Sequence, residues 1–373
     1  MRRFWSAVRE YLHATDKLLL FFWLTASALS LLFLLGLRHS ELSSLGRMLS
    51  QGIAICIGLM AALILSRIDY NMLLKLWKLY TPLCVVLVLL TFVLGVVRGG
   101  DRAWLQVIVG GRLLSLQPSE LLKISFITTL SLHISKVEGE INSLRNMLLL
   151  GLHGGAHILL IQMQDSGTAL IFCIIFVIML FCAGISWKYI AAAGAALVVS
   201  APLLWTYVMS DYQKMRILVL FNPEQYVATA YQQLQSTIAL GTGGLQGTGI
   251  FTGRHVPVPE VYNDFIFSFI GESTGFMGSI GVILLLLAIA LKILYNSSQA
   301  KDTAGRMICV GVFAMLTGQI IVNVGMCLGL LPVIGVTLPL LSQGGTSVLA
   351  LYCGLGLVLS TYRHSNTALF YEK

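Results

Sequence analysis

The stretch VPEVYNDFIFSFIGESTGFMG, residues 258–278, places the carboxylate of Asp264 directly before a long apolar run. An acid at this position has two possible roles. It could cap the helix that the apolar run predicts, because Asp and Asn are favoured at helix N-termini. Alternatively, partial desolvation beside hydrocarbon raises the pKa of a carboxyl group toward the range of a general base. Such a base could act on a substrate whose polar head protrudes from a membrane, so the stretch points to chemistry on a lipid-linked molecule.

A second group of candidates lies in RGGDRAWLQVIVGGRLLSLQPSELLKIS, which begins at Arg98. The residues QPSE predict a helix start, since Pro and an acid are favoured in the first helical turn. Glu120 and Lys123 are three residues apart and can pair on one face of that helix. A capped and paired helix start would be a purely structural role. Trp104 likewise fits an anchor at the membrane interface.

Arg102 and Arg112 of the same segment are harder to assign to structure alone. Guanidinium groups match the geometry of phosphate oxygens. Both arginines fall on the side of the membrane where the distribution of Lys and Arg predicts few cations. A pyrophosphate-bearing lipid would account for them.

Two further stretches contain chemically interesting residues. In MQDSGTAL, residues 163–170, Asp165 or Ser166 can cap the following helix. In NVGMCLGLLPVIGVTLPLLSQGGTS, residues 323–347, prolines and glycines interrupt two apolar runs. Irregular backbone at membrane depth is tolerated only where protein buries it or where it lines a cavity. We therefore expect a groove or cavity near Pro332, Pro339, Gly344 and Gly345.

Two motifs resemble known sites without matching them. GTGGLQGTG, residues 241–249, lacks the spacing and the strand-to-helix context of a dinucleotide site, so a turn-rich loop is the better interpretation. His153 and His157 are four residues apart, the spacing of a helical metal pair, but no glutamate lies between them. We expect them to be packed and hydrogen-bonded. The sequence shows no metal-ligand cluster, and a need for a divalent metal stays open.

The composition predicts an all-α, polytopic integral membrane protein. The chain is 57% hydrophobic and 11% charged, whereas soluble domains carry about 25% charged residues. Apolar runs long enough to cross about 30 Å of hydrocarbon recur along the whole chain. We predict about ten transmembrane helices in a single domain, residues 1–373, near 18–36, 50–66, 76–97, 119–134, 146–162, 168–184, 189–208, 265–295, 305–330 and 344–362.

The basic residues predict the orientation. The formal charge of +8 fits the positive-inside rule better than it fits nucleic-acid binding. With the N-terminus inside, the inner segments hold 15 Lys and Arg and the outer segments hold 8, with Lys123 inside a span. Both termini are therefore predicted to be cytoplasmic. Residues 210–264 form the longest polar segment, a large extracytoplasmic loop that we expect to be ordered and functional.

Several motifs together resemble those of the SEDS proteins (shape, elongation, division and sporulation). They are QPSELLK, GTAL, QSTIALGTGGLQGTGI, NDFIFSFIGESTGFMG and NVGMCLGLLPVIGVTLPLLSQGGTS, which occur in the order and spacing of that family and cover nearly the whole chain. The motif GMCLGLLPVIG, residues 325–335, is closer to the RodA branch, which serves cell elongation, than to the FtsW branch, which serves division. The match departs from the family at Tyr262-Asn263, where members often have His-Thr, and at Ser273, where a second acid is common.

The resemblance implies a peptidoglycan glycosyltransferase of the bacterial cytoplasmic (inner) membrane. It would polymerise lipid II, an undecaprenyl-pyrophosphate-linked disaccharide pentapeptide, on the outer face, together with a class B penicillin-binding protein. The essential acid of the family corresponds to Asp264, its loop tryptophan to Trp104, and its QPSExxK acid and base to Glu120 and Lys123. The remaining candidates for substrate contact are Arg102, Arg112, Arg254, Ser342, Gly344 and Gly345.

The reaction that we expect is a single displacement at the anomeric carbon of the donor. Asp264 would be the general base, and Arg102, Arg112 or Arg254 would offset the charge on the departing pyrophosphate. Two other functions remain open. A lipid II flippase would also use interrupted helices near the membrane midplane. A catalytically silent scaffold for a penicillin-binding protein would tolerate changes in the outer charges. An FtsW-like division polymerase is a further alternative within the family.

Overall fold

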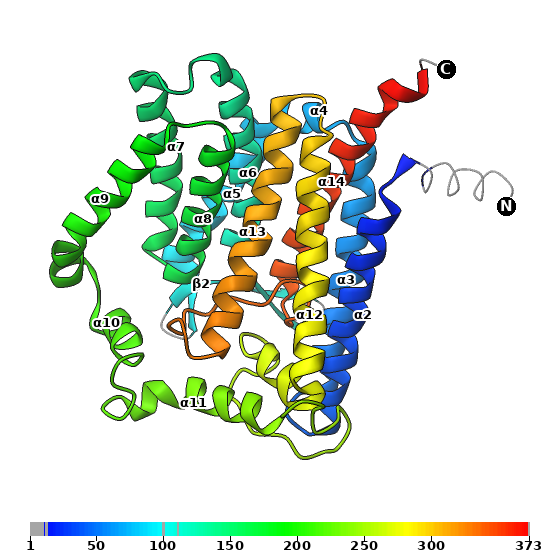
Figure 1. The fold of residues 1–373 in the computed structure, drawn as a ribbon, viewed down its shortest axis with the longest axis vertical. Coiled ribbons are helices and arrows are strands. Elements are labelled where there is room, and N and C mark those ends of the chain that lie inside the picture. Colours follow the sequence, from blue (N-terminus) through cyan, green and yellow to red (C-terminus); the bar gives the residue numbers. More distant parts are fainter. Residues whose placement is uncertain (1–10, 12–13, 99–100, 110–111, 372–373) are drawn as a thin grey trace, which may run out of the picture.

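The computed structural model describes residue 11 and residues 14–98, 101–109 and 112–371. Most of these residues form a bundle of long, roughly parallel helices (Figure 1). Every predicted span coincides with one of them: α2 (Lys17–His39), α3 (Leu45–Arg67), α5 (Trp77–Leu94), α6 (Pro118–Lys136), α7 (Leu144–Gln162), α8 (Ser166–Cys182), α9 (Trp187–Leu203), α12 (Ile266–Ser298), α13 (Thr303–Cys327) and α14 (Gly345–Tyr371).

Shorter elements connect the long helices. They are α4 (Tyr70–Lys75), the 3-10 turn η1 (Glu138–Glu140), the π-helical turn η2 (Leu204–Val208), α10 (Asp211–Leu218) and α11 (Val227–Thr242). Among the described residues, eight helices are long and apolar enough to cross a membrane. Of the other two predicted spans, α8 has 17 residues and α6 is rich in Ser and Thr. The chain is a polytopic membrane protein, and the number of ten crossings stays a prediction.

The two ends of the bundle differ in what they carry. The first residues of α2 and the last residues of α14 lie at the top of Figure 1. The strands, α10 and α11 lie in the lower half of the view, and we call this end of the bundle the loop end. The beginnings of α6, α8, α12 and α14 follow loop-end segments, so the motifs at the starts of these helices gather at one end of the molecule.

A three-stranded antiparallel sheet adds to the expected all-α architecture. Its strands are β1 (Val96–Arg98), β2 (Asp101–Val109) and β3 (Arg112–Leu116), in the order β1-β2-β3. In the pairing of β2 with β3, Val109 is opposite Arg112 and Leu105 is opposite Leu116. The sequence contains the signal for this hairpin, since β-branched residues precede Gly-Gly and an apolar run follows it. The sheet lies in the segment predicted to be the first long outer loop.

Helix α12 contains a sharp kink at Gly275, where φ is +68°. This conformation suits glycine, which has no Cβ to clash in the left-handed region. The kink frees backbone groups of α12, and the glycine-rich segment 241–249 satisfies them. The hydrogen bonds are Thr248 N to Glu272 O (2.9 Å), Gly249 N to Ser273 O (2.9 Å), Phe276 N to Gly244 O (2.9 Å) and Met277 N to Leu245 O (3.2 Å). Apart from Gly241 and Thr242, which end α11, the motif GTGGLQGTG is a turn-rich loop, as predicted.

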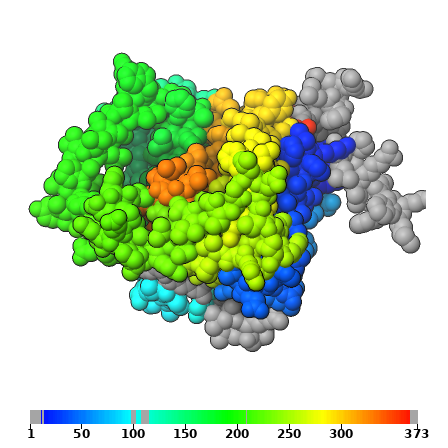
Figure 2. Space-filling model, turned by 60° about the horizontal axis from the view of Figure 1, so that its bottom comes forward, coloured from blue at the N-terminus to red at the C-terminus, as the bar shows by residue number. Residues whose placement is uncertain are grey.

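The segment 210–264 crosses the loop end of the bundle. In Figure 2 its light-green atoms cover much of this face, between the cyan sheet and the yellow start of α12. Helix α11 fastens the segment to α13. The amide of Gln233 donates to the carbonyls of Met326 (3.0 Å) and Leu331 (2.8 Å). The hydroxyl of Ser236 donates to the carbonyl of Cys327 at 2.8 Å. These hydrogen bonds hold α11 against the bundle, and the functional role of the segment stays a prediction.

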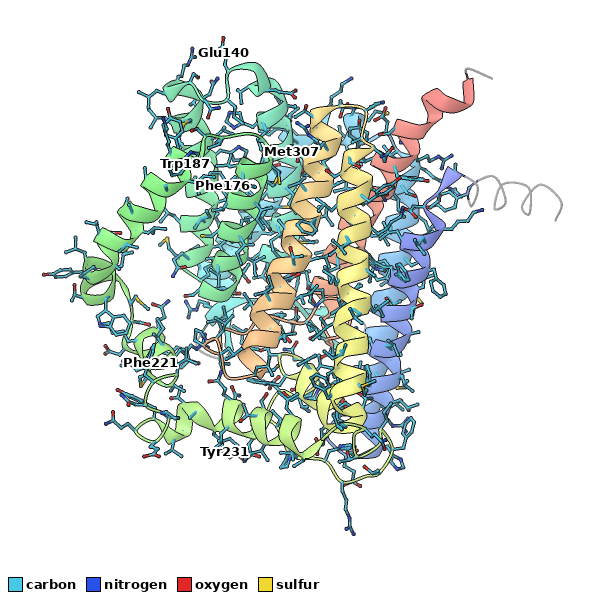
Figure 3. All side chains as sticks on the ribbon, in the orientation of Figure 1. Glu140, Phe176, Trp187, Phe221, Tyr231 and Met307 are labelled. Atoms are coloured by element: carbon cyan, nitrogen blue, oxygen red, sulfur yellow. The ribbon has the colours of Figure 1, made fainter. Side chains whose placement is uncertain are left out.

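Burial is uneven across the bundle. Helices α13 and α14 are its centre, and Met307 of α13 is fully buried (Figure 3). Helix α9 stands apart from its neighbours (Figure 1), and none of its apolar window is buried within the protein. Trp187, at the start of α9, is 70% exposed. The apolar surface of α9 is thus left for the membrane or another molecule to cover.

Candidate functional site

Asp264 does not cap α12. The N-cap residue of that helix is Phe265, and no side chain makes a capping hydrogen bond there. None of the hydrogen bonds among the described residues ends on the carboxylate of Asp264. The side chain is half-buried, so part of it remains accessible. The capping role that the sequence allowed is therefore excluded, and the role of Asp264 as a general base stays a prediction.

The backbone of Asp264 is held by the irregular segment 328–344, which connects α13 to α14. The buried amide of Asn323 donates to the carbonyl of Asp264 and to the carbonyl of Val336, each at 2.7 Å. The hydroxyl of Ser342 donates to the carbonyl of Asn263 at 2.6 Å. The predicted irregular backbone is therefore present and buried against protein. It fixes the main chain of Asp264, and no described residue forms a hydrogen bond with the carboxylate.

Gly335 lies beside the carboxylate. A Cβ atom at this position would be 3.7 Å from Oδ2 of Asp264, and φ of Gly335 is +70°. A larger residue would be strained in this conformation and would bring a side chain against the carboxylate. Glycine at 335 thus keeps space open next to Asp264.

The charges around Asp264 favour its neutral form. Burial among surrounding protein atoms, and then the negative charges of Glu260 and Asp165, raise the pKa of Asp264 from 3.8 to about 7. Arg216, on α10, opposes this shift and lowers the pKa. A carboxyl group with a pKa near neutrality can both accept and release a proton under physiological conditions.

Asp165 brings three of the sequence motifs together. It caps α8, where Oδ1 accepts from the backbone N–H of Thr168 at 2.8 Å and Oδ2 accepts from the Thr168 hydroxyl at 2.7 Å. Oδ2 also accepts from the amide of Gln117 at 2.9 Å. The backbone N–H of Gln117 donates to the hydroxyl of Thr346 at 3.2 Å. The motifs QPSE, QDSGT and GGTS therefore meet at the loop end, close enough to Asp264 for Asp165 to affect its pKa.

Glu120 and Lys123 form the predicted pair. Nζ of Lys123 is 2.8 Å from Oε1 of Glu120, and the side chains of Lys123 and Glu120 are 1% and 7% exposed, respectively. The pair is thus closed off from solvent in the first turns of α6. Its charges compensate one another inside the bundle.

The remaining candidates are spread over the loop end. Arg102, on β2, donates to the carbonyl of Phe92 at the end of α5 (3.2 Å). Trp104 lies on the same strand, opposite Val96. Arg254 is exposed in the loop before α12. No hydrogen bond or ion pair among the described residues joins Arg102 or Arg254 to Asp264.

Three further candidates complete the set. Arg112 belongs to β3, but its side chain lies outside the described residues. The backbone N–H of Gly344 donates to the amide oxygen of Gln51 at 3.1 Å. Gly345 is the first residue of α14.

Sequence reasoning missed two arginines near Asp264. The positive charge of Arg216 acts on Asp264 and lowers the pKa of its carboxyl group. The guanidinium of Arg47 lies 3.8 Å from the centre of the Tyr262 ring and donates to the Tyr262 hydroxyl at 3.1 Å. Burial raises the pKa of Tyr262 to about 12, so its hydroxyl stays protonated. Both arginines belong to predicted outer segments, the same signal that singled out Arg102.

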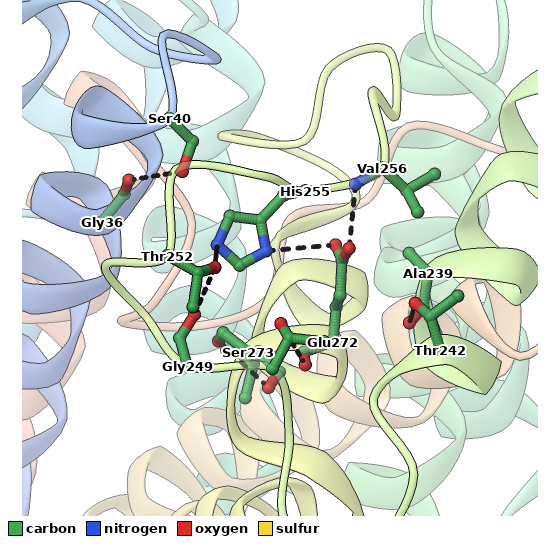
Figure 4. A network of polar contacts seen from close by, with 12 residues as sticks. Gly36, Ser40, Ala239, Thr242, Gly249, Thr252, His255, Val256, Glu272 and Ser273 are labelled. Atoms are coloured by element: carbon green, nitrogen blue, oxygen red, sulfur yellow. Dashed lines mark hydrogen bonds and ion pairs between the residues drawn. The ribbon is translucent and has the colours of Figure 1, made fainter.

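A buried His–Glu pair stabilises the loop that leads to Asp264. His255 Nδ1 is 3.5 Å from Oε2 of Glu272, and their side chains are 0% and 4% exposed. The other oxygen of Glu272 accepts from the backbone N–H of Val256 at 2.8 Å. Figure 4 shows His255 and Val256 facing the same carboxylate. Glu272 therefore anchors the chain at Val256, a short distance along the sequence before Asp264.

The structure also describes the histidines that the sequence singled out. Nδ1 of His157 is 2.8 Å from the carbonyl of His153, and Nδ1 of His153 is 3.1 Å from Nδ1 of His133. These residues are packed and hydrogen-bonded, as expected. Within the described part of the chain, no group of three or more His, Cys, Asp or Glu side chains is arranged to hold a metal ion.

Comparison with known proteins identifies the family. The family model FtsW/RodA/SpoVE, described as "Cell cycle protein", matches residues 16–367. The chain belongs to this family. It is 29% identical to peptidoglycan glycosyltransferase MrdB of Escherichia coli K12, over 97% of this chain and 96% of that protein. It is 33% identical to a probable peptidoglycan glycosyltransferase FtsW of Geobacter metallireducens, over 83% of each chain.

Solved structures of FtsW/RodA/SpoVE relatives have the same fold. One of these chains comes from a structure described as "Structural coordination of polymerization and crosslinking by a peptidoglycan synthase complex". It has a TM-score of 0.79 at 26% identity and covers 94% of this chain and 98% of its own. Another is the rod shape determining protein RodA of Thermus thermophilus, with a TM-score of 0.69 at 26% identity, covering 94% of this chain and 97% of its own.

Proposed function

We propose that this protein is a peptidoglycan glycosyltransferase that polymerises lipid II during cell elongation. One observation carries the proposal. Asp264 has a pKa near 7 and accepts no hydrogen bond from the described residues, at the end of the bundle where the family motifs meet. The names of the relatives in E. coli and G. metallireducens support the reaction class. The RodA-like sequence of residues 325–335 supports a role in cell elongation over a role in division.

The reaction is a single displacement with inversion at the anomeric carbon. Asp264 accepts the proton of the acceptor sugar hydroxyl as the hydroxyl oxygen attacks the anomeric carbon of the donor. The bond from that carbon to the pyrophosphate oxygen breaks, and the polyprenyl pyrophosphate leaves with the electron pair. Pyrophosphate is a good leaving group, so the step does not need a second carboxylic acid in the way that most glycoside hydrolases do.

Arginines offset the negative charge of the departing pyrophosphate. Arg216 and Arg47 are now stronger candidates than Arg102 or Arg254, because they lie near Asp264 or its neighbour Tyr262. Arg112 stays a candidate from the sequence. Trp104, on the strand that carries Arg102, stays a candidate for contact with the substrate at the membrane interface.

The other predicted site residues have contacts that favour supporting roles. Ser342 binds the backbone carbonyl of Asn263. The backbone N–H of Gly344 binds the side chain of Gln51. Glu120 and Lys123 are buried against each other. We propose that Ser342, Gly344 and Gly345 hold the segment beside Asp264, and that the Glu120–Lys123 pair fixes the start of α6.

The membrane orientation follows the Lys and Arg count. We propose that both termini are cytoplasmic and that the loop end faces the outer side of the inner membrane. Lipid II presented in the outer leaflet would then reach Asp264. We also propose a class B penicillin-binding protein as partner, since the structural relative with a TM-score of 0.79 comes from a complex in which polymerisation and crosslinking are coordinated.

The decisive experiment supplies lipid II to the purified protein in detergent, without a bilayer. A polymerase forms glycan strands, which gel electrophoresis or mass spectrometry detects. A flippase needs a membrane to show its activity, and a scaffold leaves lipid II unreacted. Unreacted lipid II, with and without the penicillin-binding partner, would overturn the proposal. Depletion in cells tests the elongation role separately, since rounded cells support it and filaments indicate division.

A further inference from the structure

An apolar groove of about 620 Å³ runs between α2 and α3. It begins near the loop end, close to the C-terminus of α2 and the N-terminus of α3, and extends past the middle of α3. Six of its large side chains are 36–60% exposed although all are apolar. The groove is lined by Leu31, Leu32, Leu35, Met48, Leu49, Gly52, Ile53, Cys56, Ile57 and Met60.

The opposite faces of the same two helices support the candidate site. Ser30 precedes Leu31, and its hydroxyl donates to the carbonyl of Leu341 at 2.8 Å. Gln51 precedes Gly52, and its amide donates to the carbonyl of Ser342 at 3.1 Å. Ser342 in turn binds the residue before Asp264. The groove and the candidate site therefore lie on two sides of one helix pair.

A cation lies at the loop end of the groove. Arg47 directly precedes the lining residue Met48, and its guanidinium stacks on Tyr262, two residues before Asp264. Arg47 is half-buried, and the Tyr262 ring covers one face of its guanidinium. An anionic head group bound there would lie beside Tyr262, two residues before Asp264, with its apolar part directed along α3.

The groove has the shape of a site for one long hydrocarbon chain. From Met48 to Met60 the groove follows α3 for 12 residues, which is about 18 Å of helix. This is more than half of the roughly 30 Å hydrocarbon thickness. Gly52 widens it, since no heavy atom lies within 4 Å of a Cβ built at that position.

We propose that this groove binds the polyprenyl chain of a lipid-linked substrate and that Arg47 binds its pyrophosphate. The inference rests on the proposed function, because that function supplies a ligand with both a long apolar chain and a pyrophosphate. The positive charge of Arg47, directly before the lining residue Met48, favours a lipid with a pyrophosphate head group over a phospholipid without net charge.

Photolabelling tests the groove without any need for activity. The probe is a polyprenyl pyrophosphate with a diazirine in its chain, added to the parent protein in detergent and located by peptide mass spectrometry. We expect labels on residues 31–35 and 48–60, displaced by unlabelled polyprenyl pyrophosphate and retained in excess phospholipid. Equal displacement by phospholipid would show an ordinary acyl-chain site and overturn the proposal, as would labels confined to other helices.

Gly52→Leu places a larger apolar side chain and a better helix former in the groove, at a position where no heavy atom lies within 4 Å of an added Cβ. We expect it to abolish labelling and to raise KM for long-chain lipid II about tenfold with kcat unchanged, since several buried methylene contacts are lost. A substrate with a chain too short to fill the groove should show no change. The matched control is Gly151→Leu on α7, an equally open glycine in an apolar helix.

The outcomes separate the two proposals. Labelled groove residues in a protein that leaves lipid II unreacted would refute the proposed function and keep the groove as a polyprenyl pyrophosphate site. Active protein without groove labels, or with the same KM in Gly52→Leu as in the parent, would refute the groove alone.

Discussion

The carboxylate of Glu120, in the first turn of α6, has the ammonium group of Lys123 at 2.8 Å and is almost completely buried with it. The carboxylate of Asp264, just before α12, accepts no hydrogen bond from any described residue, and the positive charge of Arg216 opposes its neutral form. The two acids occupy similar places in the sequence, each beside the start of a long helix. Their surroundings nevertheless suit opposite tasks.

A carboxylate that is paired and buried stabilises one conformation, and its proton affinity serves no reaction. A carboxylate whose backbone is fixed while its oxygens are unoccupied can receive a substrate hydroxyl. Asp264 has this arrangement, because Asn323 binds its main-chain carbonyl and Ser342 binds that of Asn263, while neither residue binds the carboxylate. Among the described residues, the hydrogen bonds to this stretch thus hold the main chain at Asn263 and Asp264 and do not involve the carboxylate.

The strongest test of this contrast is Asp264→Asn. The amide keeps the shape of the side chain but cannot accept the proton, so we expect polymerisation to fall by about 100- to 10,000-fold. The melting temperature in detergent should stay close to that of the parent or rise, because a desolvated carboxylate is removed. Parental rates of glycan synthesis in the variant would show that Asp264 is not the base.

Lys123→Met should mainly affect stability. It leaves the Glu120 carboxylate buried without a partner, which costs about 3–5 kcal/mol for a buried pair. Thermal unfolding in detergent measures this loss. The double change Glu120→Gln with Lys123→Met should recover most of it, since neither charge then remains.

A matched control for that pair exists on α10. Lys214 and Asp211 have the same three-residue spacing but are 3.7 Å apart, with Asp211 97% exposed. Lys214→Met should leave the melting temperature nearly unchanged. If Lys123→Met were equally harmless, the supporting role of the α6 pair would be wrong.

The pH dependence sharpens the comparison further. The base form of Asp264 is needed, and its pKa is raised to about 7, so activity should fall about tenfold per pH unit below that value. The stability that Asp264 contributes has the opposite pH dependence to the rate. The folded state binds the proton of Asp264 more tightly than the unfolded state, so the contribution of this group to stability is fully present below pH 3.8 and is lost as the pH rises through about 7.

Initial rates and melting temperatures across this pH range give both curves. Asp264→Asn should remove the contribution of this group to the stability curve. A rate profile that is flat from about pH 5 to pH 7 would contradict a base with this pKa.

The smallest expected effects come from the neighbouring charges. Asp165→Asn keeps a good helix cap and removes a charge that raises the pKa of Asp264, so the acidic limb of the rate profile should move to lower pH. Arg216→Gln should move it to higher pH. Glu140→Gln, at the opposite end of the bundle (Figure 3), should not move it. Shifts of the same sign in both site variants would show that these charges do not act on Asp264.

The sequence was most informative where a few consecutive residues decide the outcome. Apolar runs predicted the helices, and the three-residue spacing predicted the Glu120–Lys123 pair. Asp264 stood out because it directly precedes an apolar run. Residues brought together by the fold were not predicted. Arg47 contacts Tyr262 across 215 positions, and Asn323 binds Asp264 across 59, distances at which one sequence alone gives no pairing signal.

The kink at Gly275 has a consequence for how the loop end moves. The backbone groups that the kink frees are bonded to residues 244–249, so this glycine-rich stretch cannot open without exposing unsatisfied amides of α12 close to hydrocarbon. Its amide protons should therefore exchange with deuterium as slowly as those of a helix, although it has no regular secondary structure. The chain that leads from this stretch to Asp264 would then start from a rigid support.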